Sequence, residues 1–194
     1  MTYNPNIHHR RSIRLKEYDY SQNGAYFVTI CVQNRECLFG EIVDGEMVLN
    51  DAGEIIKTEW EKLPQQFSNI ELDVFAVMPN HFHGIVMIQN ENNVGVPLVG
   101  TQNDGQPQLQ TGQPQGIAPT GKNTIGDIIR AFKSLTTNEY IHGVKTKKFP
   151  PFEKRIWQRN YHEHIIRNEK SLETIQNYII NNPVKWQDDK FFVA

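Results

Sequence analysis

The sequence lacks several features that would each define a class of protein. None of its apolar runs approaches the roughly 18 residues that a membrane helix requires, and the N-terminus holds no apolar segment typical of a secretory signal, so we expect no membrane partner. The two cysteines, Cys31 and Cys37, are too few for a disulfide framework, which favours a reducing, cytoplasmic location. The formal net charge of −2 excludes a strongly basic protein that coats nucleic acid without selectivity.

Common motifs for nucleotide binding and hydrolysis are also absent. The chain contains no Walker loop, Gly-x-Gly-x-x-Gly, Cys-x-x-Cys, Gly-x-Ser-x-Gly or His-Glu-x-x-His motif. These absences reduce the number of reaction types that the protein could catalyse.

Composition and charge divide the 194 residues near position 122. Residues 91–122 hold six Gly, four Pro and six Gln, a composition that buries too little apolar surface to offset the entropy of ordering, so we expect a flexible insertion within a single domain spanning 1–194. Residues 1–121 carry a net charge of −7 and residues 122–194 a net charge of +5, so the C-terminal third is a modestly basic module.

The pattern of apolar residues predicts an α+β fold with an antiparallel sheet. Asp44-Gly45 is typical of a hairpin turn, and Asn50 or Asp51 is a suitable cap for the helix that follows. Pro183 ends the last helix. Strands are expected at 25–33, 38–43, 47–50, 70–78 and 81–89, and helices at 51–63, 124–140 and 169–181.

His81 and His83 are the first candidate site, because residues i and i+2 of a strand point to the same face and two imidazoles can share one divalent metal ion. The intervening Phe82 would then face the core. A second pair, His162 and His164, lies in a polar, charged run, where a solvated strand edge explains it. We therefore favour the first pair as a metal site.

Tyr178 is the second candidate, at the edge of the apolar stripe of the last helix. Asn182 follows one turn later on the same side, so the phenol and the amide can point at one spot. A phenol of ordinary pKa, about 10, needs a nearby cation to act as a nucleophile, and a metal ion held by two histidines would supply it. The alternative is an ordinary half-buried tyrosine with a solvated hydroxyl.

The run at 154–161, KRIWQRNY, alternates cations and rings, which suits single-stranded nucleic acid: phosphates on Arg or Lys and bases stacked on Trp or Tyr. The alternative is a solvated edge strand whose charges prevent aggregation. The candidate DNA-binding residues are Arg130, Lys133, Arg155, Trp157, Gln158, Arg159, Tyr161 and Arg167.

Three motifs in order resemble one family. Residues 77–86, VMPNHFHGIV, resemble the His-hydrophobe-His (HUH) strand of the single-strand tyrosine transposases. Residues 157–167, WQRNYHEHIIR, followed by 178–184, YIINNPV, resemble the C-terminal signature of the branch associated with bacterial repetitive palindromes, and Phe132-Lys133-Ser134 is similar to that branch as well.

The resemblance implies a ferredoxin-like fold with a central antiparallel sheet, and cleavage and rejoining of single-stranded DNA at hairpin-forming ends. It implies that His81, His83 and Asn182 hold Mg²⁺ or Mn²⁺ and that Tyr178 is the nucleophile, forming a 5′-phosphotyrosine intermediate. Related branches carry Gln where this chain has Asn182, which has a shorter reach. A monomer and a homodimer both remain open.

Two other functions are alternatives to a DNA-nicking and DNA-joining transposase. One is a catalytically silent protein that binds DNA hairpins. The other is a small metal-dependent hydrolase that uses His81, His83 and a carboxylate, although the sequence shows no evident third ligand or general base at helical spacing for it.

Overall fold

The fold is described from a computed structural model, which places residues 18–89, 123–147 and 149–193. The predicted insertion at 91–122 lies outside the described residues. The elements, in chain order, are β1 (Gly24–Cys31), β2 (Gly40–Val43), β3 (Glu46–Leu49), α1 (Asp51–Glu61), α2 (Leu63–Gln66), β4 (Ile70–Met78), β5 (His81–Ile88), α3 (Ile125–Thr146), β6 (His162–Ile166) and α4 (Glu169–Ile180), with short 3-10 turns at Gln33–Arg35 and Trp186–Asp188.

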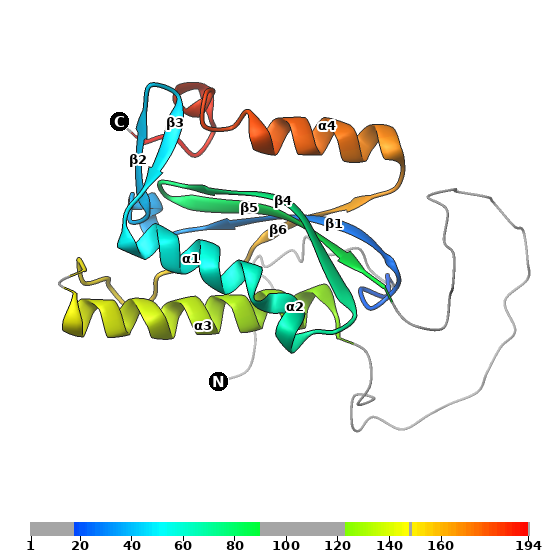
Figure 1. The fold of residues 1–194 in the computed structure, drawn as a ribbon, viewed down its shortest axis with the longest axis horizontal. Helices are drawn as coiled ribbons and strands as arrows, with labels where there is room; N and C mark the ends of the chain where they lie inside the picture. The colour runs from blue at the N-terminus through cyan, green and yellow to red at the C-terminus, as the bar shows by residue number, and fades with distance from the viewer. Residues whose placement is uncertain (1–17, 90–122, 148, 194) are drawn as a thin grey trace, which may run out of the picture.

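Four strands form the central sheet in the order β4-β5-β1-β6, and every neighbouring pair is antiparallel. Without the β2–β3 hairpin, the chain runs strand, helix, strand, strand, helix, strand, which with this strand order is the ferredoxin-like arrangement. Helices α1 and α3 lie side by side on one face of the sheet, and α4 covers the other face (Figure 1). The expected α+β class and central antiparallel sheet are confirmed.

Local sequence signals explain where several elements begin. The Asn50 side chain accepts hydrogen bonds from the first backbone N–H groups of α1, and Thr124 forms a capping box with Asp127 at the start of α3. Asp44 and Gly45, both at positive φ, make the turn of the β2–β3 hairpin. The predicted elements all occur, with α3 continuing six residues beyond 140, whereas the short helix α2 and the edge strand β6 were not predicted.

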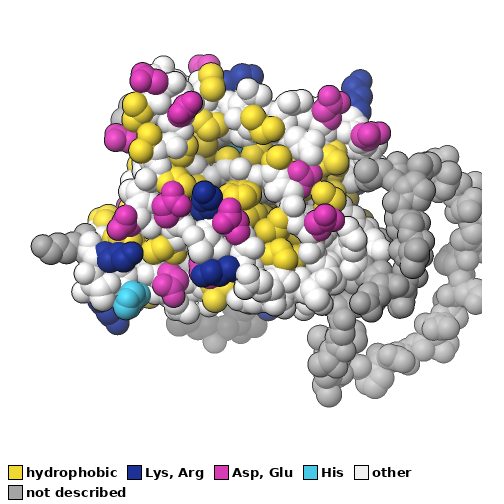
Figure 2. All heavy atoms as spheres, in the orientation of Figure 1, with side chains coloured by type: hydrophobic (Ala, Val, Ile, Leu, Met, Phe, Trp, Pro, Cys, Tyr) yellow, Lys and Arg dark blue, Asp and Glu magenta, His cyan; other side chains and the backbone are white. Residues whose placement is uncertain are grey.

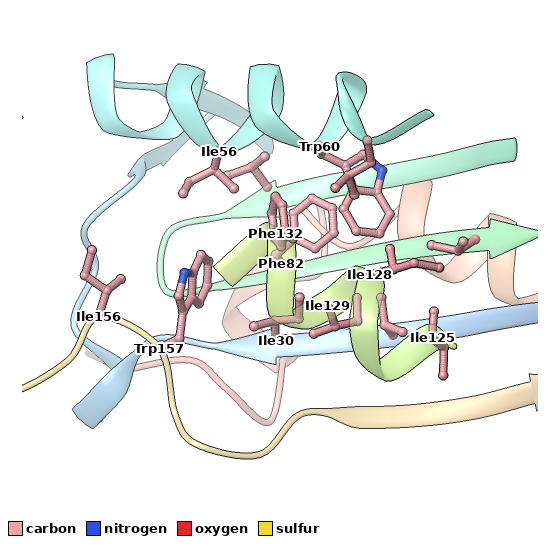
Figure 3. Packing of buried hydrophobic residues seen from close by; sticks show 14 of the residues in the cluster. Ile30, Ile56, Trp60, Phe82, Ile125, Ile128, Ile129, Phe132, Ile156 and Trp157 are labelled. Atoms are coloured by element: carbon pink, nitrogen blue, oxygen red, sulfur yellow. The ribbon is translucent and has the colours of Figure 1, made fainter. Parts of the chain in front are cut away.

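The main core lies between the sheet and the layer formed by α1 and α3 (Figure 3). Phe82 of β5 is fully buried there against Trp60 and Phe132, with ring centroids 4.5 and 5.1 Å apart. Gly84, on the same face, leaves room for Trp60, because a Cβ at this position would come within 2.6 Å of the indole. This close packing holds β5 in place. Because side chains alternate along a strand, His81 and His83 are then directed to the opposite face of the sheet.

A smaller cluster packs α4 onto the other face, centred on Ile179, Ile85 and Ile166. It anchors the helix that carries Tyr178. Among the described residues, no helix combines the length and the hydropathy needed to cross a bilayer.

Candidate active site

His81 and His83 form a buried pair on the α4 face of the sheet. Their side chains are 0 % and 1 % exposed, and their Nε2 atoms lie 3.0 Å apart. Phe82 between them points into the main core, so the two imidazoles lie on the opposite face of the sheet. The structure therefore brings the two imidazoles together as the alternation along a strand predicts.

Neighbouring side chains orient both rings through their Nδ1 atoms. The Asn80 amide nitrogen donates to two backbone carbonyls, so its oxygen is the acceptor that lies 2.9 Å from His81 Nδ1. His81 Nδ1 therefore carries the proton, and its Nε2 keeps a lone pair. Thr29 Oγ1 lies 2.9 Å from His83 Nδ1, and a hydroxyl can donate to this atom or accept from it. Such partners of the distal nitrogen are typical of metal-ligating histidines.

Burial keeps this pair neutral. It lowers the pKa of His81 to about 4, although the nearby Asp189 carboxylate acts in the opposite direction. Burial, together with the charge that His81 would carry, lowers the pKa of His83 well below its ordinary value. Neutral imidazole is the form that binds metal, so both rings are ready as ligands at neutral pH.

Tyr178 of α4 lies directly above His83. Its Oη is 3.3 Å from His83 Nε2, its ring stands edge-on to the imidazole at 5.2 Å, and its side chain is 40 % exposed. Burial of the inner part of the ring, assisted by the Asp189 charge, raises the pKa of Tyr178 to about 12. The phenol thus lies at the histidines of its own chain, open to solvent on one side and protonated at neutral pH.

Asn182 and Asp189 complete the polar centre. Asn182 is 2 % exposed; its Nδ2 donates to Asp189 Oδ2 at 2.9 Å, while its Oδ1 has no hydrogen-bond partner among the described residues. The ligand-type atoms of His81, His83 and Asp189 all lie within 4.8 Å of one another. Two imidazole nitrogens, a carboxylate and an orphaned amide oxygen form a donor set that fits a divalent cation such as Mn²⁺.

The sequence prediction did not include Asp189. Asp188 and Asp189 are the only acidic residues that follow Tyr178 in the printed sequence. This position was the one sequence feature that could have suggested a carboxylate ligand near Tyr178. They lie in or just after an irregular turn, where no periodicity indicates which side chain faces inward.

The C-terminal segment that carries Asp189 covers the histidines. The Phe191 ring lies 4.7 Å from the His81 ring, and the Phe191 backbone oxygen accepts a hydrogen bond of 2.8 Å from Asn80 Nδ2. Arg35 Nη1 donates to the Lys190 backbone oxygen. This segment excludes water from one side of the pair and leaves the Tyr178 side open.

The predicted DNA-binding residues fall into two groups. Residues from the loop before β6 and from the middle of α3 line a hollow of about 310 Å³. The loop is bound to the end of β1, because the Gln158 N–H donates to the Cys31 carbonyl. The predicted residues that line this hollow are Lys133, Arg155, Trp157, Gln158 and Arg159.

Two of these predictions need correction. Trp157 is 4 % exposed and packs on Phe132, with its indole N–H donating to Thr136 Oγ1 at 2.9 Å, so it belongs to the core and is not available for base stacking. Lys133 Nζ donates to the carbonyls of Gln158 and Asn160, so its ammonium group is engaged in holding the loop in place. Burial lowers the pKa of Lys133 to about 8.

The remaining candidates lie outside this hollow. Arg130 is exposed on α3, on the face of the sheet opposite Tyr178, and pairs with Asp127 at 3.0 Å. Tyr161 is half-buried, with its ring 5.4 Å from Lys133 Nζ. Arg167 is exposed directly after β6.

Comparisons with known proteins identify relatives over nearly the whole chain. No protein-family model matches the sequence. A Haemophilus influenzae protein named only as uncharacterized is 44 % identical over 195 residues, covering 98 % of this chain and 97 % of its own length. A second Haemophilus influenzae protein, named as a REP-associated tyrosine transposase, is 25 % identical over 168 residues, covering 86 % of this chain and 74 % of its own.

A solved structure shares the fold. It is a REP-associated tyrosine transposase bound to a REP hairpin, with a TM-score of 0.54 and 20 % identity, covering 92 % of this chain and 77 % of the other.

Proposed function

Because the chain belongs to the family of REP-associated tyrosine transposases, we propose that it is a metal-dependent enzyme that nicks and rejoins single-stranded DNA at hairpin-forming ends. One observation carries the proposal: the Tyr178 phenol lies 3.3 Å from a buried histidine pair whose Nε2 atoms converge. An ordinary surface tyrosine does not require such neighbours.

His81, His83 and Asp189 would hold the ion, with Asn182 Oδ1 as a further oxygen ligand. When bound, a divalent ion supplies Lewis-acid polarisation of the scissile phosphate and lowers the cost of ionising a neighbouring phenol. Asn80 and Thr29 hold the two rings in the orientation that this requires.

Tyr178 is the attacking group. Its oxygen loses the phenolic proton and forms a bond to phosphorus while the bond from phosphorus to the 3′-oxygen breaks. This gives a 5′-phosphotyrosine link, and the released 3′-oxygen takes up a proton to become a 3′-hydroxyl. Attack by that or another 3′-hydroxyl reverses the step, so the phosphodiester energy is conserved and no nucleotide triphosphate is consumed. The 40 % exposure of Tyr178 leaves the access that a DNA strand requires.

Binding would use accessible cationic and amide side chains at the end of β1, the strand whose Cys31 pairs with His81. Arg155, Gln158 and Arg159 are the predicted DNA-binding residues with accessible side chains beside the end of β1. By contrast, acidic side chains are spread over the face seen in Figure 2, which does not suit a phosphate backbone.

The test is covalent capture. A hairpin-bearing single strand labelled at its 3′ end is incubated with the protein and Mn²⁺, then denatured and resolved by electrophoresis. We expect a labelled protein adduct with the wild type and with the control Tyr18→Phe, and none with Tyr178→Phe, with His81→Ala or in excess chelator.

Each alternative gives a different pattern. An adduct that persists in Tyr178→Phe contradicts the assignment of the nucleophile. Cleavage to a free 5′-phosphate without any adduct indicates a hydrolase, and hairpin binding without cleavage indicates a silent binding protein.

A further inference from the structure

A hollow of about 490 Å³ lies beside Tyr178, between α4 and the two strands β1 and β6. Its floor is formed by Phe27 of β1 and His164 of β6, which are direct partners in the register and so point to the same face. Its wall is the side of α4 that presents Ser171, Thr174 and Ile175.

Phe27 connects this hollow to the active site. Its ring stacks on His83 with the centroids 5.4 Å apart and the planes at 28°, and it stands edge-on to Tyr178 at 6.1 Å. The ring is half-buried, so part of it lines open space. The Phe27 ring therefore connects the floor of the hollow to the His83 ring in the candidate active site.

The character of the hollow matches one chemical group. Flat aromatic surface next to aliphatic side chains suits a nucleobase, whose faces stack on rings irrespective of sequence. The exposed Lys170 also lines the hollow, and its ammonium group suits the phosphate attached to such a base. Thr174 lies one helical turn before Tyr178, about 6 Å along the axis, a distance that one extended nucleotide can span.

We propose that this hollow seats the unpaired base of a nucleotide next to the scissile phosphate, stacked on Phe27, with Lys170 at its phosphate. The inference rests on the proposed function, because it takes the attacked strand to be single-stranded DNA. A base that is paired in a duplex cannot enter the hollow, so the site selects single strands. His164, part of the exposed second His-x-His pair, gains a role in the floor without being a metal ligand.

The test fills the hollow and measures binding without catalysis. Thr174→Trp places an indole in the wall, and Glu173→Trp, at an exposed neighbouring position that does not line the hollow, is the matched control. Affinity for a short fluorescent single strand without a hairpin is measured by anisotropy in chelator. We expect Thr174→Trp to bind about 5- to 100-fold more weakly, since one stacked base contributes this much, and Glu173→Trp to bind as the wild type does.

Phe27→Leu provides a second variant, which keeps apolar volume and removes the ring. We expect a comparable loss of affinity, with thermal unfolding monitored to confirm that each variant is folded. If both Thr174→Trp and Phe27→Leu bind like the control while folded, the inference is wrong.

Photo-crosslinking tests the position of the base directly, and comparing adduct formation with binding distinguishes a wrong base site from a wrong proposed function. With single strands that contain 5-iodouracil, we expect crosslinks to peptides holding Phe27 or His164, and crosslinks confined to 154–161 would overturn the inference. Normal adduct formation together with unaffected binding by Thr174→Trp refutes only the base site. Loss of binding in Thr174→Trp without any wild-type adduct refutes only the proposed chemistry.

Discussion

His81 and His83 on β5 and His162 and His164 on β6 have the same spacing, and the register places them on the same face of the sheet, two strands apart. The first pair is 1 % exposed or less, whereas both members of the second pair are exposed at a sheet edge. The first pair also has Asn80, Thr29 and Asp189 around it. The spacing brings imidazoles together in both places, and the surrounding side chains decide which pair suits a metal ion.

The largest expected difference between the pairs is in metal affinity. His81→Ala removes a proposed ligand and should weaken Mn²⁺ binding by more than about 100-fold, since even residues that only orient ligands contribute about 10- to 100-fold. His162→Ala should leave the dissociation constant unchanged. Isothermal titration calorimetry at neutral pH checks both, and equal losses in the two variants would contradict the distinction.

The next difference concerns stability at low pH. The unfolded chain protonates its histidines near pH 6.5, whereas burial lowers the pKa of His81 to about 4 and that of His83 well below its ordinary value. The contribution of the pair is therefore complete above about pH 6.5 and is lost as the pH falls toward 4. Between pH 7 and pH 5, the free energy of unfolding should fall by about 2 kcal/mol for each buried histidine.

Urea unfolding in chelator measures this dependence. His83→Gln should remove about half of the fall, while His162→Ala should retain all of it. An identical pH dependence in His83→Gln and the wild type would show that the buried pair is not responsible.

The smallest expected effect concerns Asp189. Among the described residues, only the buried histidine pair has a carboxylate within ligand distance. Asp189→Asn keeps the size of the side chain and removes its charge, so Mn²⁺ binding should weaken by about tenfold. Asp188→Asn, on the preceding residue, is the matched control and should bind as the wild type does. Calorimetry that shows no difference between the two variants would exclude Asp189 as a ligand.

The sequence predicts the framework of this site better than its periphery. Alternation along β5 correctly assigns Phe82 to the core and both histidines to the other face, because strand geometry has a fixed period of two. Helical spacing likewise places Tyr178 at the edge of a buried stripe, and the structure shows it partly exposed beside Ile179.

Irregular segments were less predictable. Alternating cations and rings at 154–161 favour a surface for single-stranded nucleic acid, with Trp157 exposed for base stacking. Trp157 instead turns inward and donates a hydrogen bond to Thr136 of α3, a partner that no local pattern reveals. Asp189 reaches His81 through a turn after Pro183, and the contact joins residues more than 100 positions apart. Such long-range contacts depend on the completed fold.

Asn80 binds both the His81 ring and the Phe191 carbonyl, so the residue before the histidine motif joins it to the end of the chain. During synthesis, β5 leaves the ribosome long before α4 and the final turn. A nascent chain that has reached residue 160 therefore contains both histidines but neither Tyr178 nor Asp189. The proposed site can therefore assemble only after Asp189 has emerged, and a translation product that stops before residue 178 would lack both its phenol and its carboxylate.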